Sequence, residues 1–196
     1  MPDRPWTRAA PTLIVVVVAV LLMASPAAGH AVAVDPALLP AWQALTTVRD
    51  REGRDVGESY AAIAEVTQVR IVVGPPLRGS LASYEWPANV ITVSPDILGE
   101  DPRAVAAILA HELTHALQAS ARLDRSMDCV AREVDAYLTE VYVWDTLWGG
   151  NPPTRTRLEE RLTARSDILA NEGEAGLVRF VTESPRYRDQ CELDGA

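Results

Sequence analysis

The sequence predicts an α+β fold in which a small sheet is followed by several helices. Two observations support this expectation. Beyond the N-terminal apolar run, short segments rich in β-branched residues occur at positions 69–94, whereas apolar residues at helical spacing dominate from position 102 onward. Strands and helices that are segregated along a chain are typical of domains whose helices gather on one side of a small sheet. The 196 residues are enough for one such domain.

The first expected elements are a helix and three short strands. Residues 41–67 have a helical pattern that is interrupted around Gly53–Gly57. The segment "VRIVVG", residues 69–74, is predicted to be a strand because it is β-branched and runs into a Gly-Pro-Pro breaker. Residues 80–86 and 89–94 are separated by a Pro-Ala pair, and we expect them to form an antiparallel hairpin.

Helices are expected in the rest of the chain. Asp101 is placed to cap the clearest of them, residues 102–122, which has a proline in its first turn. A second long helix is predicted over residues 128–147, where a Gly-Gly-Asn-Pro-Pro segment follows. A third is expected at 154–171, and a short fourth includes 177–181. The C-terminal part of the domain is therefore predicted to be rich in helix.

The N-terminus has the anatomy of an export signal. Arg4 and Arg8 precede an unbroken apolar run from Leu13 to Ala24, which small residues and Pro26 follow. This run suits a signal peptide and is shorter than the roughly 20 residues that cross a bilayer as a helix. We therefore expect residues 1–33 to be a signal peptide or an uncleaved N-terminal membrane anchor.

The predicted export signal also sets the expected bounds of the domain and its location. Ala31–Ala33 and Ala27–Gly29 are alternative cleavage sites, and residues 34–196 form the expected domain. The domain would be secreted or anchored at the outer face of the cytoplasmic membrane, with possible membrane attachment through the N-terminal segment. The formal charge of −9 and the lack of a basic stripe predict no nucleic-acid partner. The oligomeric state is not readable from the sequence.

Cys129 and Cys191 are the two cysteines of the chain. An even number of cysteines in an exported protein favours a disulfide. A metal site built on them is disfavoured, because they are isolated and have no C-x-x-C spacing. We expect the bond to tie the start of the second long helix to the C-terminal tail.

The segment "AHELTHALQ" brings two of the three histidines of the chain together. On a helix, His111 and His115 lie one above the other, so both imidazoles can reach one metal ion. Zinc prefers nitrogen donors of this kind. Glu112 is rotated by about 100° from His111 and lies near such an ion without facing it, where it can accept a proton from a water molecule. The H-E-x-x-H spacing therefore predicts a catalytic zinc site.

The third zinc ligand must come from elsewhere in the chain. The remaining histidine, His30, is expected to leave with the signal peptide, so a carboxylate is needed. Glu133 and Asp135 in "CVAREVDAYLTE" are the candidates, and a turn before this segment would return its helix antiparallel to the first. Glu133 shares one helical face with Cys129, Ala136, Tyr137 and Glu140.

The segments "HELTH" and "EVDAY" resemble the gluzincin metallopeptidases, most closely the small single-domain members. In that family the H-E-x-x-H motif supplies two zinc ligands, and a glutamate on a later helix supplies the third. The resemblance implies a zincin-like fold in which His111, His115 and Glu133 bind Zn²⁺ and Glu112 is the general base. It also implies that the strand "NVITV", Asn89–Val93, forms the edge along which the substrate lies.

The resemblance covers about residues 90–145 and departs from the family pattern at one position. Four residues after the ligand glutamate, the family often has an aspartate that orients a ligating histidine, and this chain has Tyr137. Asp135 and Asp128 are possible substitutes for the missing aspartate.

No histidine remains to stabilise the oxyanion that forms during peptide hydrolysis, so a tyrosine hydroxyl is the natural substitute. Tyr137 is the candidate closest to the motif in sequence. Tyr84, Tyr142 and Tyr187 are the alternatives, and each tyrosine is also a common packing residue.

These residues predict an exported zinc metallopeptidase that hydrolyses a protein or peptide substrate through zinc-activated water, with Glu112 as the general base. The alternative is a non-catalytic, zinc-bound interaction module on the cell surface. Glu112 discriminates between them, because a binding module needs the ligands but has no need of a base. A third interpretation treats the histidines as incidental and predicts no bound zinc.

Overall fold

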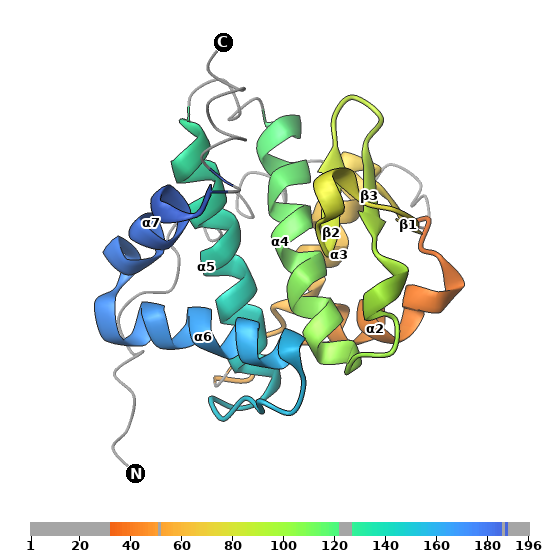
Figure 1. Ribbon diagram of the computed structural model, residues 1–196. Coiled ribbons are helices and arrows are strands. Elements are labelled where there is room, and N and C mark those ends of the chain that lie inside the picture. Colours follow the sequence, from red (N-terminus) through yellow and green to blue (C-terminus); the bar gives the residue numbers. More distant parts are fainter. Residues whose placement is uncertain (1–31, 51, 122–126, 186, 188–196) are drawn as a thin grey trace.

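The computed structural model describes residues 32–50, 52–121, 127–185 and 187 (Figure 1). The predicted signal or anchor segment therefore lies almost entirely outside the described residues. Among the described helices, none combines the length and the apolar character that crossing a membrane requires. Cys129 has no free thiol, but its predicted partner Cys191 lies outside the described residues, so that pairing stays a prediction.

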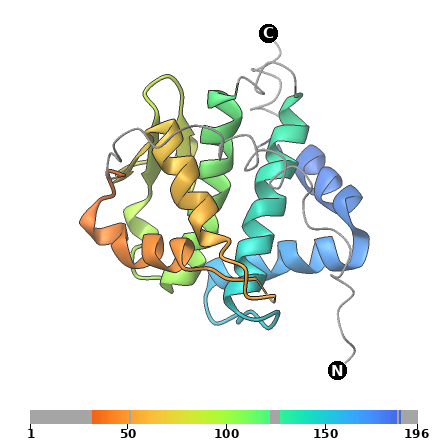
Figure 2. The ribbon, with the colours of Figure 1, turned by 180° about the vertical axis from the view of Figure 1, so that it is seen from behind.

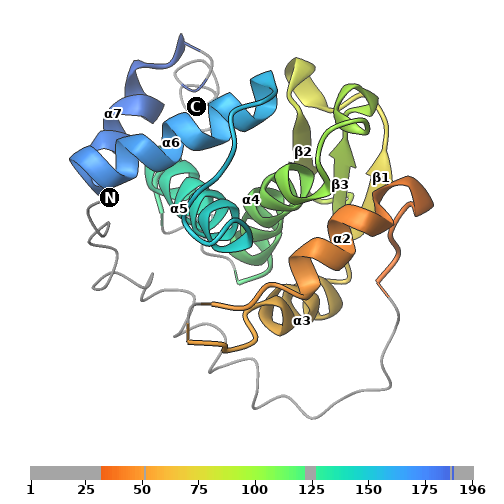
Figure 3. The ribbon, with the colours of Figure 1, turned by 90° about the horizontal axis from the view of Figure 1, so that it is seen from below.

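The described residues form an α+β fold, as predicted, with the sheet beside the helix that carries the histidine motif (Figure 1). Seen from below, the sheet lies on one side of that helix, and the C-terminal helices lie on the other (Figure 3). The elements in chain order are α2 (Leu39–Thr46), α3 (Gly57–Thr67), β1 (Arg70–Val73), β2 (Ala82–Glu85), β3 (Val90–Val93), α4 (Pro102–Ser120), α5 (Cys129–Leu147), α6 (Arg157–Glu172) and α7 (Glu174–Glu183).

The sheet is mixed, which corrects the expectation of a small antiparallel sheet. The predicted hairpin is present, with β2 antiparallel to β3, but β1 pairs with β3 in parallel and the strand order is β1-β3-β2. The strand expected to form the substrate-binding edge, β3, is therefore the central strand. Ile91 and Val93 of this strand are completely buried, which favours the central position.

The two outer strands differ in how they are covered. Val34 forms a bridge to Ile71, so the lead-in to the domain lies along the outer side of β1. Within the described residues, no strand pairs with the outer side of β2. The open edge of the sheet is therefore β2, which packs against α4 more extensively than β3 does.

The first helical region is divided more widely than predicted. Residues 47–56 separate α2 from α3, and the loop is closed by a bridge between Arg49 and Asp55. Gly57 starts α3 so close to the end of α2 that a Cβ atom there would lie 2.2 Å from the carbonyl oxygen of Thr46. The chain reverses direction through the loop of residues 47–56. Glycine at position 57 permits the close approach of the two helices.

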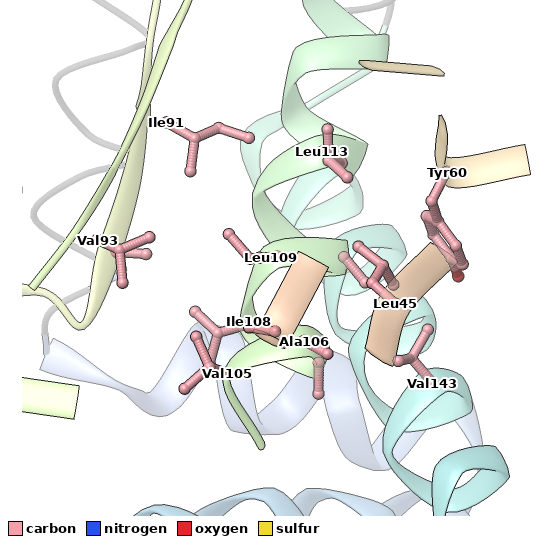
Figure 4. Packing of buried hydrophobic residues seen from close by; sticks show 14 of the residues in the cluster. Leu45, Tyr60, Ile91, Val93, Val105, Ala106, Ile108, Leu109, Leu113 and Val143 are labelled. Carbon is pink, nitrogen blue, oxygen red and sulfur yellow. The ribbon is translucent and has the colours of Figure 1, made fainter. Parts of the chain in front are cut away.

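Helix α4 is the central element of the core. Asp101 caps it by accepting a hydrogen bond from the backbone N–H of Arg103, as the sequence predicts for the cap position. Leu109 and Leu113 are completely buried. Figure 4 shows strand residues Ile91 and Val93 on one side of this helix and residues of other helices on the opposite side. Since α4 is enclosed by packing, the histidines that it carries have a rigid support.

Helices α2 and α3 cover the back of α4, whereas α6 and α7 pack against α5 (Figures 1 and 2). A second apolar cluster joins α5 to α7 through Val134, Tyr137, Leu177 and Val181. The predicted helices after residue 100 are confirmed, and their observed bounds lie within a few residues of the predicted ones. The C-terminal helices thereby support the helix that bears Glu133.

Candidate metal centre

Three side chains from α4 and α5 converge as the sequence predicts. Nε2 of His111 lies 3.2 Å from Nε2 of His115. One carboxylate oxygen of Glu133 lies 3.7 Å from the first of these nitrogens, and the other oxygen lies 3.6 Å from the second. His111 and Glu133 are buried, and His115 is partly buried. The antiparallel packing of α4 against α5 therefore gathers two nitrogens and a carboxylate at one point.

The spacing of these atoms fits a metal ion. Zinc binds nitrogen and carboxylate oxygen at about 2.0–2.2 Å in a tetrahedral arrangement, which places neighbouring ligand atoms about 3.3 Å apart. The three observed separations are close to this value, and the ligand atoms all lie within 4.8 Å of one another. A set of two imidazoles and one carboxylate also leaves a fourth position for water or substrate, as catalytic zinc requires.

His115 is oriented by its other ring nitrogen. Its Nδ1 lies 3.0 Å from Oε1 of Gln118, and the amide nitrogen of Gln118 donates to the backbone carbonyl of Arg132. The donation to Arg132 sets the orientation of the amide, so Oε1 faces the histidine. Because an amide oxygen only accepts, Nδ1 of His115 carries the proton and Nε2 presents a lone pair to the site.

A carboxylate lies beside the other ring nitrogen of His111. Nδ1 of His111 lies 3.6 Å from Oε2 of Glu140, and the other oxygen of this carboxylate accepts a hydrogen bond from Nε of Arg165. Glu140 and Arg165 are both buried. Burial raises the pKa of Glu140, and the positive charge of Arg165 acts in the opposite direction.

The expected substitutes for the missing aspartate, Asp135 and Asp128, have different surroundings in the structure. Glu140, rather than Asp135 or Asp128, occupies the place beside His111. Asp128 instead caps α5 by accepting from the backbone N–H of Ala131. Asp135 is not part of the group that can hold a metal ion, but its side chain forms a hydrogen bond with Gln118, which contacts Nδ1 of His115; burial raises the pKa of Asp135. Glu140 follows Glu133 by seven residues, so the helical spacing that selects Glu133 could also have indicated Glu140.

Glu112 lies beside the ligands in a site with little access to water. Its side chain accepts a hydrogen bond from the backbone N–H of Tyr84, in the open-edge strand β2. The pKa of Glu112 is raised to about 7, mainly by burial; the negative charges of Glu133 and Glu140 act in the same direction, whereas His115 and the hydrogen bond from Tyr84 lower it. A carboxylate with a pKa near neutrality can both accept and release a proton at the same pH.

Tyr137, the proposed oxyanion group, lies next to the site. Its ring packs edge-on against His111, with the ring centres 4.7 Å apart, and its hydroxyl group forms a hydrogen bond with that of Tyr187. The hydroxyl of Tyr84 contacts Asn89 at 3.2 Å, and Tyr142 packs against the main core. The role of Tyr137 in catalysis stays a prediction.

No family model, curated protein or solved structure matches this chain. The site can therefore be interpreted only from its own residues. Its distinguishing feature is the combination of a metal-binding group with a buried, hydrogen-bonded carboxylate, Glu112, that belongs to no ligand set.

Proposed function

We propose that this chain is an exported, gluzincin-like zinc metallopeptidase that hydrolyses protein or peptide substrates. The observation that carries the proposal is the convergence of His111, His115 and Glu133, with Glu112 buried next to them. Neither part would suffice alone, because a metal ion can be structural and a buried glutamate can be a packing residue. Together they supply a ligand set with an open position and a base.

In this proposal His111, His115 and Glu133 hold the zinc ion. When bound, zinc lowers the pKa of a coordinated water to about 7 and polarises the carbonyl of the scissile bond. Glu112 would accept a proton from the attacking water as the water oxygen bonds to the carbonyl carbon. Glu112 would then give this proton to the leaving nitrogen as the C–N bond breaks. The burial that raises the pKa of Glu112 to about 7 in the metal-free chain supports this role.

The open edge of β2 is the surface on which an extended substrate would lie. The unpaired backbone groups of an outer strand can bind a peptide by adding it to the sheet. Tyr84 belongs to this strand and its backbone N–H reaches Glu112, so a substrate on β2 would pass the base. The central strand β3 is paired on both sides and cannot serve in this way.

Export rests on the apolar segment Leu13–Ala24, and it places the enzyme outside the cytoplasmic membrane. A non-catalytic zinc-bound module remains the alternative function. That module would need the three ligands but would gain nothing from a buried base, since burying a carboxylate costs free energy. The free-energy cost of burying the Glu112 carboxylate is explained if Glu112 takes part in proton transfer.

The Glu112→Gln variant tests the proposal, because glutamine keeps the size of the side chain but cannot take up a proton. We expect the variant to bind about one zinc per chain and to hydrolyse unfolded proteins or peptide libraries roughly 10² to 10⁴ times more slowly than the unmodified chain. Zinc is measured by metal analysis and hydrolysis by mass spectrometry of the products.

Glu160→Gln is the matched control, because Glu160 is an exposed glutamate on α6. It should leave both zinc content and hydrolysis unchanged. If the zinc-loaded, unmodified chain cleaves nothing that the Glu112→Gln variant does not also cleave, the peptidase proposal fails and the binding module is favoured.

A further inference from the structure

A charged pair is buried on the side of His111 that faces away from Glu133. Glu140 of α5 has 2% of its side chain exposed, and Arg165 of α6 has 5%. Arg165 donates from Nε to one oxygen of Glu140, and the other oxygen lies 3.6 Å from Nδ1 of His111. The pair thus joins α6 to a candidate ligand on α4 through α5.

The burial of this pair is not explained by packing alone. Removing two charges from water is costly, and apolar residues of similar volume usually replace a buried pair without loss of stability. Arg165 uses only one oxygen of Glu140 in the contact that the structure shows, which leaves the second oxygen toward His111. The burial of both charges is explained if the carboxylate of Glu140 must face the imidazole of His111.

The ring of Tyr137 restrains the same histidine from a second direction. The guanidinium carbon of Arg165 lies 5.1 Å from the centre of this ring, and the ring meets that of His111 at an interplanar angle of 66°. His111 therefore cannot rotate about its side-chain bonds without disturbing both Glu140 and Tyr137. Its Nε2 is held toward Glu133.

We propose that Glu140 and Arg165 are positioning residues that orient His111 for metal binding. The carboxylate of Glu140, 3.6 Å from Nδ1 of His111, electrostatically favours the proton on this nitrogen, which leaves the lone pair on Nε2, and Arg165 fixes the rotamer of Glu140. Outer carboxylates of this kind orient metal-bound histidines and increase their basicity. The inference rests on the proposed zinc site and adds α6 to the elements that this site requires.

Two variants of the full-length chain separate positioning from stability. Glu140→Gln removes the charge and leaves Arg165 buried without its partner, so this variant can lose stability as well. The double variant Glu140→Met/Arg165→Met replaces the pair by apolar side chains, and we expect it to keep the thermal midpoint of the unmodified chain. Both should bind Zn²⁺ about 10- to 100-fold more weakly, measured by competition with a chromophoric chelator.

The matched control is Glu159→Gln. Glu159 is also a buried carboxylate paired with an arginine, Arg155, but this pair lies at the start of α6. The control should lower the thermal midpoint and leave zinc affinity unchanged. The visible spectrum of the Co²⁺-loaded chain provides a second readout, and it should change in the Glu140 and double variants but not in the control.

The outcomes distinguish the two proposals. One outcome is that the unmodified chain binds Zn²⁺ while the double variant binds it equally tightly and has the same Co²⁺ spectrum. In that case the pair is structural and the positioning role is overturned, but the proposed zinc site is not contradicted. If the unmodified chain itself binds no Zn²⁺, the zinc site is wrong and the positioning role falls with it.

Discussion

Glu133 and Asp135 lie two positions apart on α5 and have different surroundings. Glu133 faces His111 and His115, whereas Asp135 is outside the group that can hold a metal ion. Residues two apart on a helix are separated by about 200° around its axis, so only one of them can face the histidines. The structure places Glu133 in that position, as the sequence predicts.

We therefore expect Glu133→Gln to lower zinc affinity by at least about 100-fold, more than the loss of an orienting group does, because it removes a ligand. Asp135→Asn is the matched control and should change the affinity little. Chelator competition measures both. A larger loss from Asp135→Asn than from Glu133→Gln would assign the ligand to Asp135 and rotate α5 relative to α4.

The residues that the sequence could predict are those related by local spacing. His111, Glu112 and His115 follow from one turn of helix, and Glu133 follows from a helical face. Glu140 lies on the same face but contacts His111 only because α5 packs against α4 at a particular rotation. Arg165 comes from a third helix, and no spacing within a single helix could bring it to Glu140.

Local signals also explain which elements were predicted correctly. Helix α4 has a cap at Asp101 and a proline in its first turn, and its start is predicted correctly. The parallel pairing of β1 with β3 was missed, because strand direction depends on how the intervening loop and β2 are placed. The width of the loop between α2 and α3 was missed because no glycine or proline in residues 47–52 marks the end of α2.

The contact at Gly57 gives a prediction about how α2 and α3 pack. Gly57→Ala places a Cβ atom 2.2 Å from the backbone carbonyl of Thr46, so the helices must move apart. We expect the free energy of unfolding to fall by about 1–3 kcal/mol, as for other overpacked sites. Urea denaturation followed by circular dichroism measures this change.

Gly99→Ala is the control for this substitution, because a Cβ atom at Gly99 would have no heavy atom within 4 Å. Its free energy of unfolding should remain within about 0.5 kcal/mol of the unmodified chain. Equal effects at Gly57 and Gly99 would show that α2 and α3 do not approach each other as closely as the structure indicates.

At the scale of the whole molecule, a cluster of charged side chains connects the start of α4 with the start of α6. Arg155, just before α6, contacts Asp101 at the cap of α4 and Glu159 within α6. Trp148, at the end of α5, lies under Arg103, whose guanidinium carbon is 3.3 Å from a ring centre of the indole. Three helices therefore meet at this cluster, at the opposite end of α5 from Glu133.

The cluster should make the fold sensitive to acid. The hydrogen bond from Arg155 lowers the pKa of Glu159 from its ordinary value of 4.5, and the hydrogen bond from Arg103 lowers that of Asp101. A carboxyl whose pKa is lower in the folded state than in the unfolded chain stabilises the fold at a pH above its unfolded pKa. That stabilisation is lost as the pH falls through the folded pKa.

Glu159→Gln should therefore destabilise the domain at neutral pH and matter less in acid. We expect a loss of about 1 kcal/mol near pH 6, because Glu159 is buried but Arg155 is 60% exposed and water screens the pair. The difference from the unmodified chain should be smaller at about pH 3, because Glu159 takes up a proton in the unfolded chain below its ordinary pKa of 4.5, and it is lost once the folded state is protonated as well. Urea midpoints at the two pH values measure it, with the exposed Glu160→Gln as control. A difference that stays constant or grows toward acid would show that Glu159 stabilises the fold by its shape and not by its charge.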